Sequence, residues 1–117
     1  MDGEGNCYEV AALTVILDSH HTLCHGFVIG QGPLEGMKIG HAWTEHVETM
    51  GAPERQYEMP MVTDHSNGRS IIVPQPLYYY FGRIDPEEVR RYEPREARAL
   101  MRQHGHYGPW EEAEVDG

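Results

Sequence analysis

The pattern of apolar and polar positions near the start of the chain predicts a helix over residues 6–18. Within the stretch GNCYEVAALTVIL, four apolar side chains recur at helical spacing and form the expected buried face: Val10, Leu13, Ile16 and Leu17. Asn6 is a favourable N-cap, and Glu9 three residues later completes a pair typical of a capping box. We therefore expect Cys7 to be the first residue of this helix.

Four β-prone runs follow this helix and predict an antiparallel sheet, at residues 23–30, 38–48, 57–64 and 70–73. Pro60 lies inside the third run and indicates an edge strand or a bulge, because proline cannot donate to a ladder. The Ser66-Asn67-Gly68 stretch is a strong hairpin signal between the third and fourth runs.

The last third of the chain predicts short helices. One begins with Asp85 as N-cap and Pro86 in the first turn. Another covers residues 94–103, with three residues facing inward: Ala97, Leu100 and Met101. We expect residues 77–81 to form a short strand or part of the core, and residues 106–110 to dock on the body. The fold class is therefore α+β, a single domain over residues 1–117 with an N-terminal helix, an antiparallel sheet and short C-terminal helices.

Composition and charge restrict the classes of partner. The 117 residues carry a formal net charge of −10, which argues against nucleic acid or an anionic membrane as partner. No apolar run approaches the roughly 20 residues of a membrane span, and the N-terminus lacks the basic region of a signal peptide. We expect a cytoplasmic protein without a structural disulfide, and a solvated, mobile acidic tail at residues 111–117. The oligomeric state is left open.

A cysteine at a helix start points to nucleophilic chemistry. The first-turn N–H groups and the positive end of the helix dipole would favour the thiolate of Cys7. Such a nucleophile needs a base, and His41 in IGHAWTEHVE is the candidate, with Gly40 beside it leaving room for a substrate or a close backbone approach. Asp64 in MVTDHSNG ends the neighbouring strand, where its carboxylate can orient the imidazole.

The blocks GNCYEVAALTVIL, GHAWTE and VTDHSNG, in this order, resemble the three catalytic blocks of the transglutaminase-like, papain-related cysteine superfamily. In that superfamily a cysteine opens a helix packed on an antiparallel sheet, a histidine follows in a strand, often as His-Ala-Trp-x-Glu, and an aspartate ends the next strand. The resemblance covers about residues 5–73. It implies that Cys7 is the nucleophile, His41 the general base and acid, and Asp64 the orienting residue.

Three further residues are candidates for oxyanion or support roles. Asn6 carries a side-chain amide directly before the cysteine, and Trp43 belongs to the histidine block. Asn67 is a second candidate for orienting the histidine, ranked behind Asp64, because papain-type sites use an amide there. The backbone N–H of Cys7 is the first expected oxyanion donor.

These residues predict a small cysteine hydrolase or acyltransferase that acts on an amide or thioester carbonyl of a protein or a small molecule, without metal or cofactor. Peptidase, deamidase and transglutaminase-like activities use the same steps. The alternative is a non-catalytic binding or inhibitor protein that keeps the fold and engages a protein or small ligand. In that case Cys7 is an inert buried thiol, His41 a structural histidine and Asp64 a turn residue.

A competing set of candidates lies in the stretch HHTLCHG, which holds His20, His21, Cys24 and His25. Thiolate and imidazole groups so close together can bind zinc or copper. Because no second half of such a site is visible elsewhere in the chain, we expect an exposed histidine-rich turn instead.

Other polar and aromatic residues have structural interpretations. Glu45 shares a strand face with His41 and can bind a substrate amine, but we expect a salt bridge to Arg69. Several aromatic side chains can stack on a base or a sugar, although we expect most of them in the core: Trp43, Tyr78, Tyr79, Tyr80 and Trp110.

Overall fold

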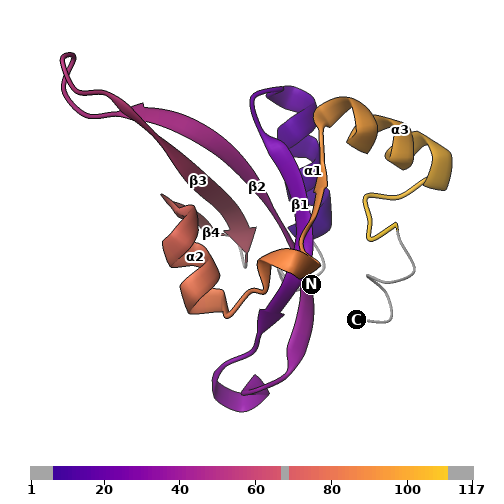
Figure 1. The fold of residues 1–117 in the computed structure, drawn as a ribbon. Helices are drawn as coiled ribbons and strands as arrows, with labels where there is room; N and C mark the ends of the chain where they lie inside the picture. The colour runs from indigo at the N-terminus through magenta and orange to yellow at the C-terminus, as the bar shows by residue number, and fades with distance from the viewer. Residues whose placement is uncertain (1–6, 67–68, 111–117) are drawn as a thin grey trace.

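A five-stranded antiparallel sheet forms the centre of the computed structural model, which describes residues 7–66 and 69–110 (Figure 1). The strands lie in the order β4-β3-β2-β1-β5, and every neighbouring pair is antiparallel. They comprise β1 (Thr22–Ile29), β2 (Lys38–Met50), β3 (Tyr57–Ser66), β4 (Arg69–Pro74) and β5 (Arg90–Tyr92). Four of them correspond to the predicted runs, whereas the three-residue strand β5 was not predicted.

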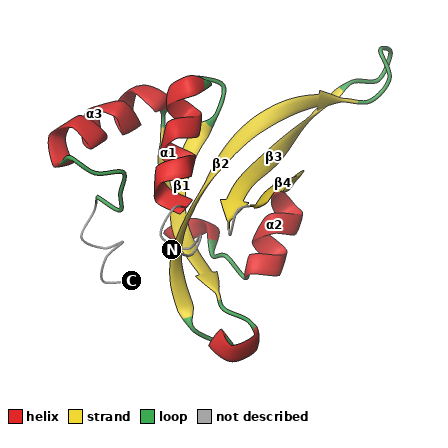
Figure 2. Cartoon of the chain, turned by 180° about the vertical axis from the view of Figure 1, so that it is seen from behind, coloured by secondary structure: helices red, strands yellow, loops and turns green. Residues whose placement is uncertain are grey.

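Helices cover both faces of this sheet. The α-helices are α1 (Cys7–Leu17), α2 (Gln75–Gly82) and α3 (Pro94–His104), and two short 3₁₀ turns are η2 (Gly32–Leu34) and η3 (Pro86–Glu88). Helices α1 and α3 lie on one side of the sheet and α2 lies on the other (Figure 2). This arrangement confirms the α+β fold class.

The helix α1 presents small residues to the sheet. Its buried side chains are Cys7, Ala11, Ala12 and Val15. Leu13 and Leu17, which the sequence placed on the buried face, are instead exposed. The predicted face was wrong because it followed the largest side chains, whereas alanines let the helix axis approach the strands closely. Leu23, Ala42 and Tyr92 complete this core from the sheet, and Ala97 completes it from α3.

A second core lies under α2. It is built from the fully buried Trp43 with Cys24, Val62 and Ile84. Gly26 on β1 makes room for the indole, since a Cβ at this position would lie 2.7 Å from Cη2 of Trp43.

The aromatic run 77–81 lies in the helix α2, so the short strand, one of the two alternatives expected for it, is absent. Tyr78 and Tyr79 pack against the second core, whereas Leu77, Tyr80 and Phe81 are exposed. Aromatic residues favour strands by local preference, but here adjacent tyrosines both reach the sheet from one helix. From this helix the hydroxyls of Tyr78 and Tyr79 each donate to a carboxylate on the sheet.

The strands β2 and β3 form a long hairpin whose distal part extends away from the rest of the molecule (Figure 1). Pro60 lies in this part and is paired with Val47 of β2. The β3–β4 ladder begins only at Met61, so β3 is an inner strand of the sheet but has no β4 partner at Pro60. At Pro60 itself β3 is an edge strand, as expected, but from Met61 to Thr63 β3 has neighbours on both sides.

The C-terminal elements follow the sequence pattern. Asp85 caps η3 by accepting a hydrogen bond from the backbone N–H of Glu87 at 2.9 Å. In α3, Ala97 is fully buried, and Trp110 packs against Tyr92 and His25, so the segment after α3 docks on the body as expected.

Some expectations fall on residues outside those described: the N-cap Asn6, the turn at 67–68 and the tail 111–117. Within the described part of the chain, no helix has the length and apolar character needed to cross a membrane. Cys7 and Cys24 are both free thiols.

Candidate active site

The site lies where the two central strands part. The β2–β3 ladder ends at the pair Thr44 and Thr63, so His41 and Asp64 lie beyond its last pair. Beyond this point β3 continues to pair with β4 while β2 continues to pair with β1. The helix α1 begins at this opening with Cys7. The three predicted residues, Cys7, His41 and Asp64, therefore lie together.

His41 and Asp64 form a bidentate contact. The imidazole Nε2 lies 3.1 Å from each carboxylate oxygen of Asp64. Both side chains are largely buried, with exposed fractions of 16% and 11%. Because Nε2 is occupied by the carboxylate, the other ring nitrogen, Nδ1, is left for a partner on the opposite side of the ring.

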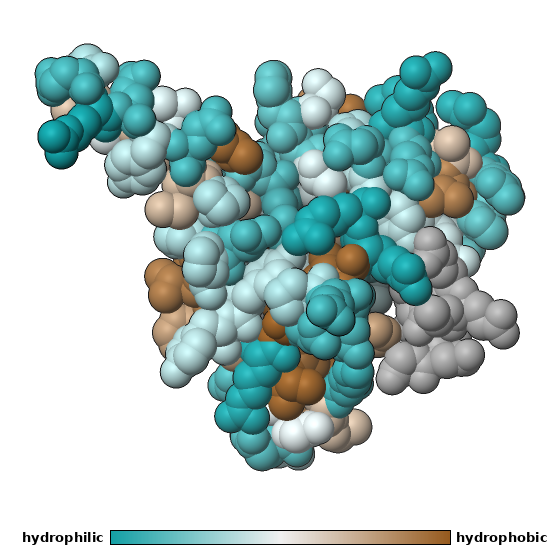
Figure 3. All heavy atoms as spheres, viewed as in Figure 1, coloured by the Kyte–Doolittle hydropathy of each residue, from teal (hydrophilic) through white to brown (hydrophobic). Residues whose placement is uncertain are grey.

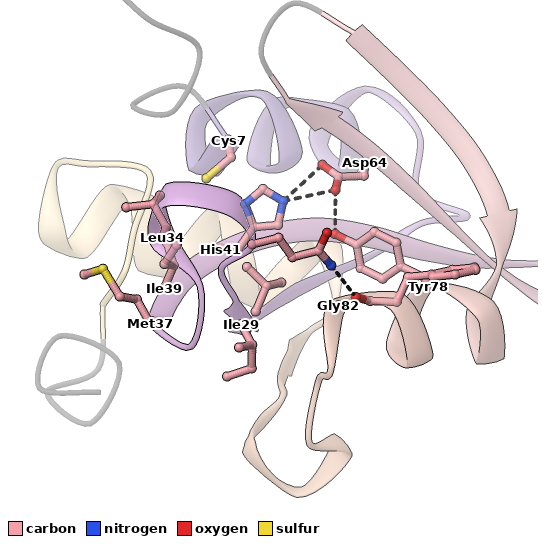
Figure 4. Close-up of a pocket in the computed structure, with 13 residues that line it drawn as sticks. Cys7, Ile29, Leu34, Met37, Ile39, His41, Asp64, Tyr78 and Gly82 are labelled. Atoms are coloured by element: carbon pink, nitrogen blue, oxygen red, sulfur yellow. Dashed lines mark hydrogen bonds and ion pairs between the residues drawn. The ribbon is translucent and has the colours of Figure 1, made fainter.

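Cys7 occupies that opposite side. Its sulfur points toward the His41 ring from the start of α1 (Figure 4), and a hydrogen bond joins the two side chains. Only 4% of Cys7 is exposed, yet the residue lines a cavity. The first-turn N–H groups of a helix lack partners within the helix, and its dipole favours negative charge at this end. A thiolate is therefore well accommodated here.

The electrostatics favour a protonated imidazole. Burial alone would lower the pKa of His41, but the hydrogen bonds and the negative charges of Asp64 and Cys7 outweigh it and raise the pKa to about 9. At neutral pH the raised pKa thus favours an imidazolium, which lies between the Asp64 carboxylate and the Cys7 sulfur. A thiolate–imidazolium ion pair is the reactive state of a cysteine nucleophile.

Tyr78 is a part of the site that the sequence did not predict. Its hydroxyl donates to Oδ2 of Asp64 at 2.5 Å, from the helix α2 on the far side of the carboxylate. Burial, followed by the charge of Asp64, raises the pKa of Tyr78, so the phenol stays a donor. The sequence held one signal for this helix: Pro76 in its first turn and Gly82 at its end.

Trp43 supports the site from within the core. It is fully buried, its ring lies 6.2 Å from that of His41, and its Nε1 donates to Glu45 at 3.0 Å. Trp43 does not belong to the described lining of the cavity, so it fixes the strand that carries the histidine and does not contact the cavity.

Glu45 anchors α2 to the sheet. It accepts hydrogen bonds from Gln75 at 2.9 Å and from the hydroxyl of Tyr79 at 2.6 Å. Glu45 forms a salt bridge with Arg91 of β5, in which Oε1 lies 3.3 Å from a guanidinium nitrogen. The expected salt bridge to Arg69 was therefore wrong, because the unpredicted strand β5 brings a different arginine to the Glu45 face of the sheet.

Gly40 permits a close approach, as the sequence suggested. A Cβ at this position would lie 3.0 Å from the hydroxyl of Tyr8, the residue that follows the cysteine. The candidates Asn6 and Asn67 lie outside the described residues. Asn67 was the second candidate for orienting the histidine. Asp64 occupies the Nε2 side of the His41 ring, where such a residue would lie.

A cavity of about 760 Å³ opens beside the sulfur. Cys7, His41, Asp64 and Tyr78 line one part of it, and the β1–β2 hairpin and α2 supply the rest. Its size is typical of sites that bury a small ligand. Cys7 and His41 are therefore both at the wall of a cavity of this size.

The predicted histidine-rich turn is only partly present. His20 is exposed, but Cys24 and His25 are buried neighbours on β1 and face opposite sides of the sheet. His25 packs among Tyr8, Tyr92 and Trp110, and burial raises the pKa of the Cys24 thiol. Across residues 7–66 and 69–110, no group of three or more His, Cys, Asp or Glu side chains is placed to hold a metal ion.

Comparison with known proteins gives no neighbour for this arrangement: the chain matches no family model, no curated protein and no solved structure.

Proposed function

We propose that this protein is a small cysteine hydrolase or acyltransferase that acts on an amide or thioester carbonyl through Cys7, His41 and Asp64. The observation that carries the proposal is the continuous chain of contacts from the thiol through both sides of the imidazole to the carboxylate, at the wall of a cavity. Nucleophile, base and orienting group each occupy the place that their role requires.

The proposed reaction has two steps. The Cys7 sulfur attacks the carbonyl carbon, a C–S bond forms, and the negative charge on oxygen faces the start of α1. The bond to the leaving amine or thiol then breaks, and this group takes the proton from His41. Water next attacks the acyl-cysteine, gives a proton to His41, and releases the acid as the C–S bond breaks. An amine in place of water yields a new amide.

The sequence resemblance to the transglutaminase-like, papain-related superfamily supports the same proposal, because the three blocks that carry it are the blocks that meet at the site. Cys7, His41 and Asp64 come from a helix start and two strands in the order that the resemblance implies. Peptidase, deamidase and transglutaminase-like reactions share this chemistry.

The pH dependence of Cys7 alkylation by iodoacetamide tests the proposal, measured in a Cys24→Ser background. An ordinary thiol loses reactivity below its pKa of about 8.5, whereas an ion pair with His41 keeps its rate well below that pH. We expect such a plateau in the parent protein and its loss in His41→Ala. A profile like that of an ordinary thiol, unchanged by His41→Ala, would falsify the triad.

A non-catalytic binding protein is the second candidate. Large apolar side chains lie at the surface of α2 and of the edge strand β4: Leu77, Tyr80, Ile71 and Ile72. Contact with a partner would cover such residues. An unreactive thiol in a normally folded protein would favour this function over the enzyme.

A further inference from the structure

The cavity beside Cys7 has a strongly apolar wall. Six side chains form it: Val28, Ile29, Leu34, Met37, Ile39 and Phe81. Five of them belong to the β1–β2 hairpin, and Phe81 comes from the facing end of α2. Figure 4 shows the hairpin side chains on one side of the His41 ring and α2 on another, and Figure 3 shows apolar residues at the surface in this region.

The charged side chains of the cavity wall, the Asp64 carboxylate and the His41 imidazolium, are already paired with each other. None of its described lining residues is a lysine or an arginine. The nearest basic residues in sequence are paired outside it, Lys38 with Glu88 at 2.7 Å and Arg83 with Glu35 at 3.2 Å. A charged ligand group would lose its hydration here without a compensating ion pair.

The polar side chains of the lining are already engaged. Asp64 accepts from both His41 and Tyr78, and the side-chain amide of Gln31 donates to the carbonyl of Phe81 at 3.2 Å. A peptide backbone in this cavity would bring several amide groups to these engaged side chains. A hydrocarbon chain brings none, so it fits the lining better.

We infer that the cavity is an acyl-binding pocket that selects an uncharged, apolar acyl group, of alkyl or aromatic character, on the carbonyl that Cys7 attacks. This inference rests on the proposed function, since it identifies the acyl side of that reaction. The hydrocarbon part lies between the β1–β2 hairpin and Phe81, and the carbonyl lies at Cys7. The net charge of −10 also disfavours leaving groups that carry several negative charges.

Methanethiosulfonates test the pocket directly, because they transfer their side group to a thiolate without any need for acyl chemistry. Methyl, butyl and hexyl reagents form the apolar series, and ethylsulfonate and ethyltrimethylammonium reagents carry opposite charges. Rates are followed by intact-protein mass spectrometry in the Cys24→Ser background at one pH. We expect the rate to rise two- to fourfold per added methylene over this series.

The two charged reagents separate the pocket from the overall field of the protein. An apolar pocket slows both relative to the butyl reagent, whereas the acidic field alone would speed the cation. A cation that reacts faster than the butyl reagent, or a series with no dependence on chain length, would overturn the inference.

Phe81 and Tyr80 give a matched pair of variants on α2. Both are exposed, at 64% and 75%, so either alanine variant is expected to fold, but Phe81 lines the cavity and Tyr80 is not among its lining residues. Phe81→Ala should reduce the hexyl-to-methyl rate ratio severalfold, and Tyr80→Ala should leave it unchanged. Equal effects of the two substitutions would contradict the pocket.

The rate ratio and the pH profile report on different proposals. The ratio between two reagents at one pH cancels the fraction of thiolate, whereas the profile of the methyl reagent measures thiolate activation. If the hexyl-to-methyl rate ratio is high but the pH profile is that of an ordinary thiol, the pocket binds apolar groups and the proposed acyl-enzyme is wrong. If the pH profile shows an activated thiolate but the rate does not depend on chain length, the proposed enzyme stands and the apolar pocket is wrong.

Acylation by p-nitrophenyl esters then distinguishes an acyl chain from a peptide. We expect p-nitrophenyl hexanoate to acylate Cys7 faster than both the acetate ester and the N-acetylphenylalanine ester. If the N-acetylphenylalanine ester reacts fastest, the occupant is a peptide and the assignment of an acyl chain is wrong.

Discussion

The hydroxyl of Tyr78 donates to the same carboxylate of Asp64 that holds Nε2 of His41. Asp64 is thus fixed from two sides, by the helix α2 and by the strand β2. Because the hydroxyl does not contact the thiol, we regard Tyr78 as a positioning residue that acts through Asp64.

Tyr78→Phe should therefore weaken the activation of Cys7 without abolishing it. A hydrogen bond of about 1 kcal/mol corresponds to a rate reduced about fivefold in alkylation near neutral pH. Tyr79→Phe is the matched control, since Tyr79 is its neighbour on α2 but donates to Glu45. It should reduce the free energy of unfolding and leave the pH profile of alkylation unchanged. Identical profiles for the two variants would remove Tyr78 from the site.

The titration of His41 tests the role of Asp64. Its pKa is raised to about 9, and one cause is the charge of Asp64, so Asp64→Asn should move the titration to lower pH. Imidazole NMR resonances followed against pH measure this midpoint, with His41→Ala used for assignment. Glu48→Gln is a suitable control, because Glu48 contacts a different histidine, His46, at 2.9 Å. A His41 midpoint unchanged by Asp64→Asn would contradict the electrostatic coupling.

The same titration should appear in protein stability. The folded state binds the His41 proton more tightly than the unfolded chain, because the pKa is raised from 6.5 to about 9. The resulting stabilisation is complete below about pH 6.5 and is lost as the pH rises toward 9, by up to about 3 kcal/mol. Urea unfolding of the parent and of His41→Ala at several pH values measures it. A difference between the two that does not vary with pH would refute this linkage.

Arg91 and Arg69 provide a test of the Glu45 anchor. Arg91→Met removes the cation that contacts Glu45, which is 8% exposed, and should reduce the free energy of unfolding by about 1 kcal/mol. Arg69 lies on the edge strand β4 and is exposed, so Arg69→Met should have no measurable effect. Chemical denaturation of both variants measures the free energy of unfolding. A larger decrease in Arg69→Met than in Arg91→Met would contradict the pairing of Glu45 with Arg91.

Gly26 tests how tightly the second core is packed. A Cβ here would lie 2.7 Å from Cη2 of Trp43, so Gly26→Ala should reduce the free energy of unfolding by about 1 to 3 kcal/mol. The cost should be smaller in a Trp43→Phe background, because the shorter ring removes the conflicting atoms. An equal cost in both backgrounds would mean that the indole does not require the glycine.

Local signals in the sequence were sufficient for the types of most elements and for part of the site. Periodicity and end residues predicted α1, four strands and α3 to within a few residues, because such preferences act over neighbouring positions. The expected pairing of two antiparallel strands also predicted that Asp64 lies near His41, and the resemblance to the cysteine superfamily implied that Cys7 joins them.

Contacts between distant segments were decided only by the tertiary structure. The aromatic run 77–81 is helical despite the preference of aromatic residues for strands, and from this helix the hydroxyls of Tyr78 and Tyr79 reach Asp64 and Glu45. The ion pair of Glu45 with Arg91 depends on the strand β5, which has too few residues to show a pattern in the sequence. The chain alone thus determined which residues are candidates for the site, and packing decided which neighbours position them, because local preferences carry no information on distant partners.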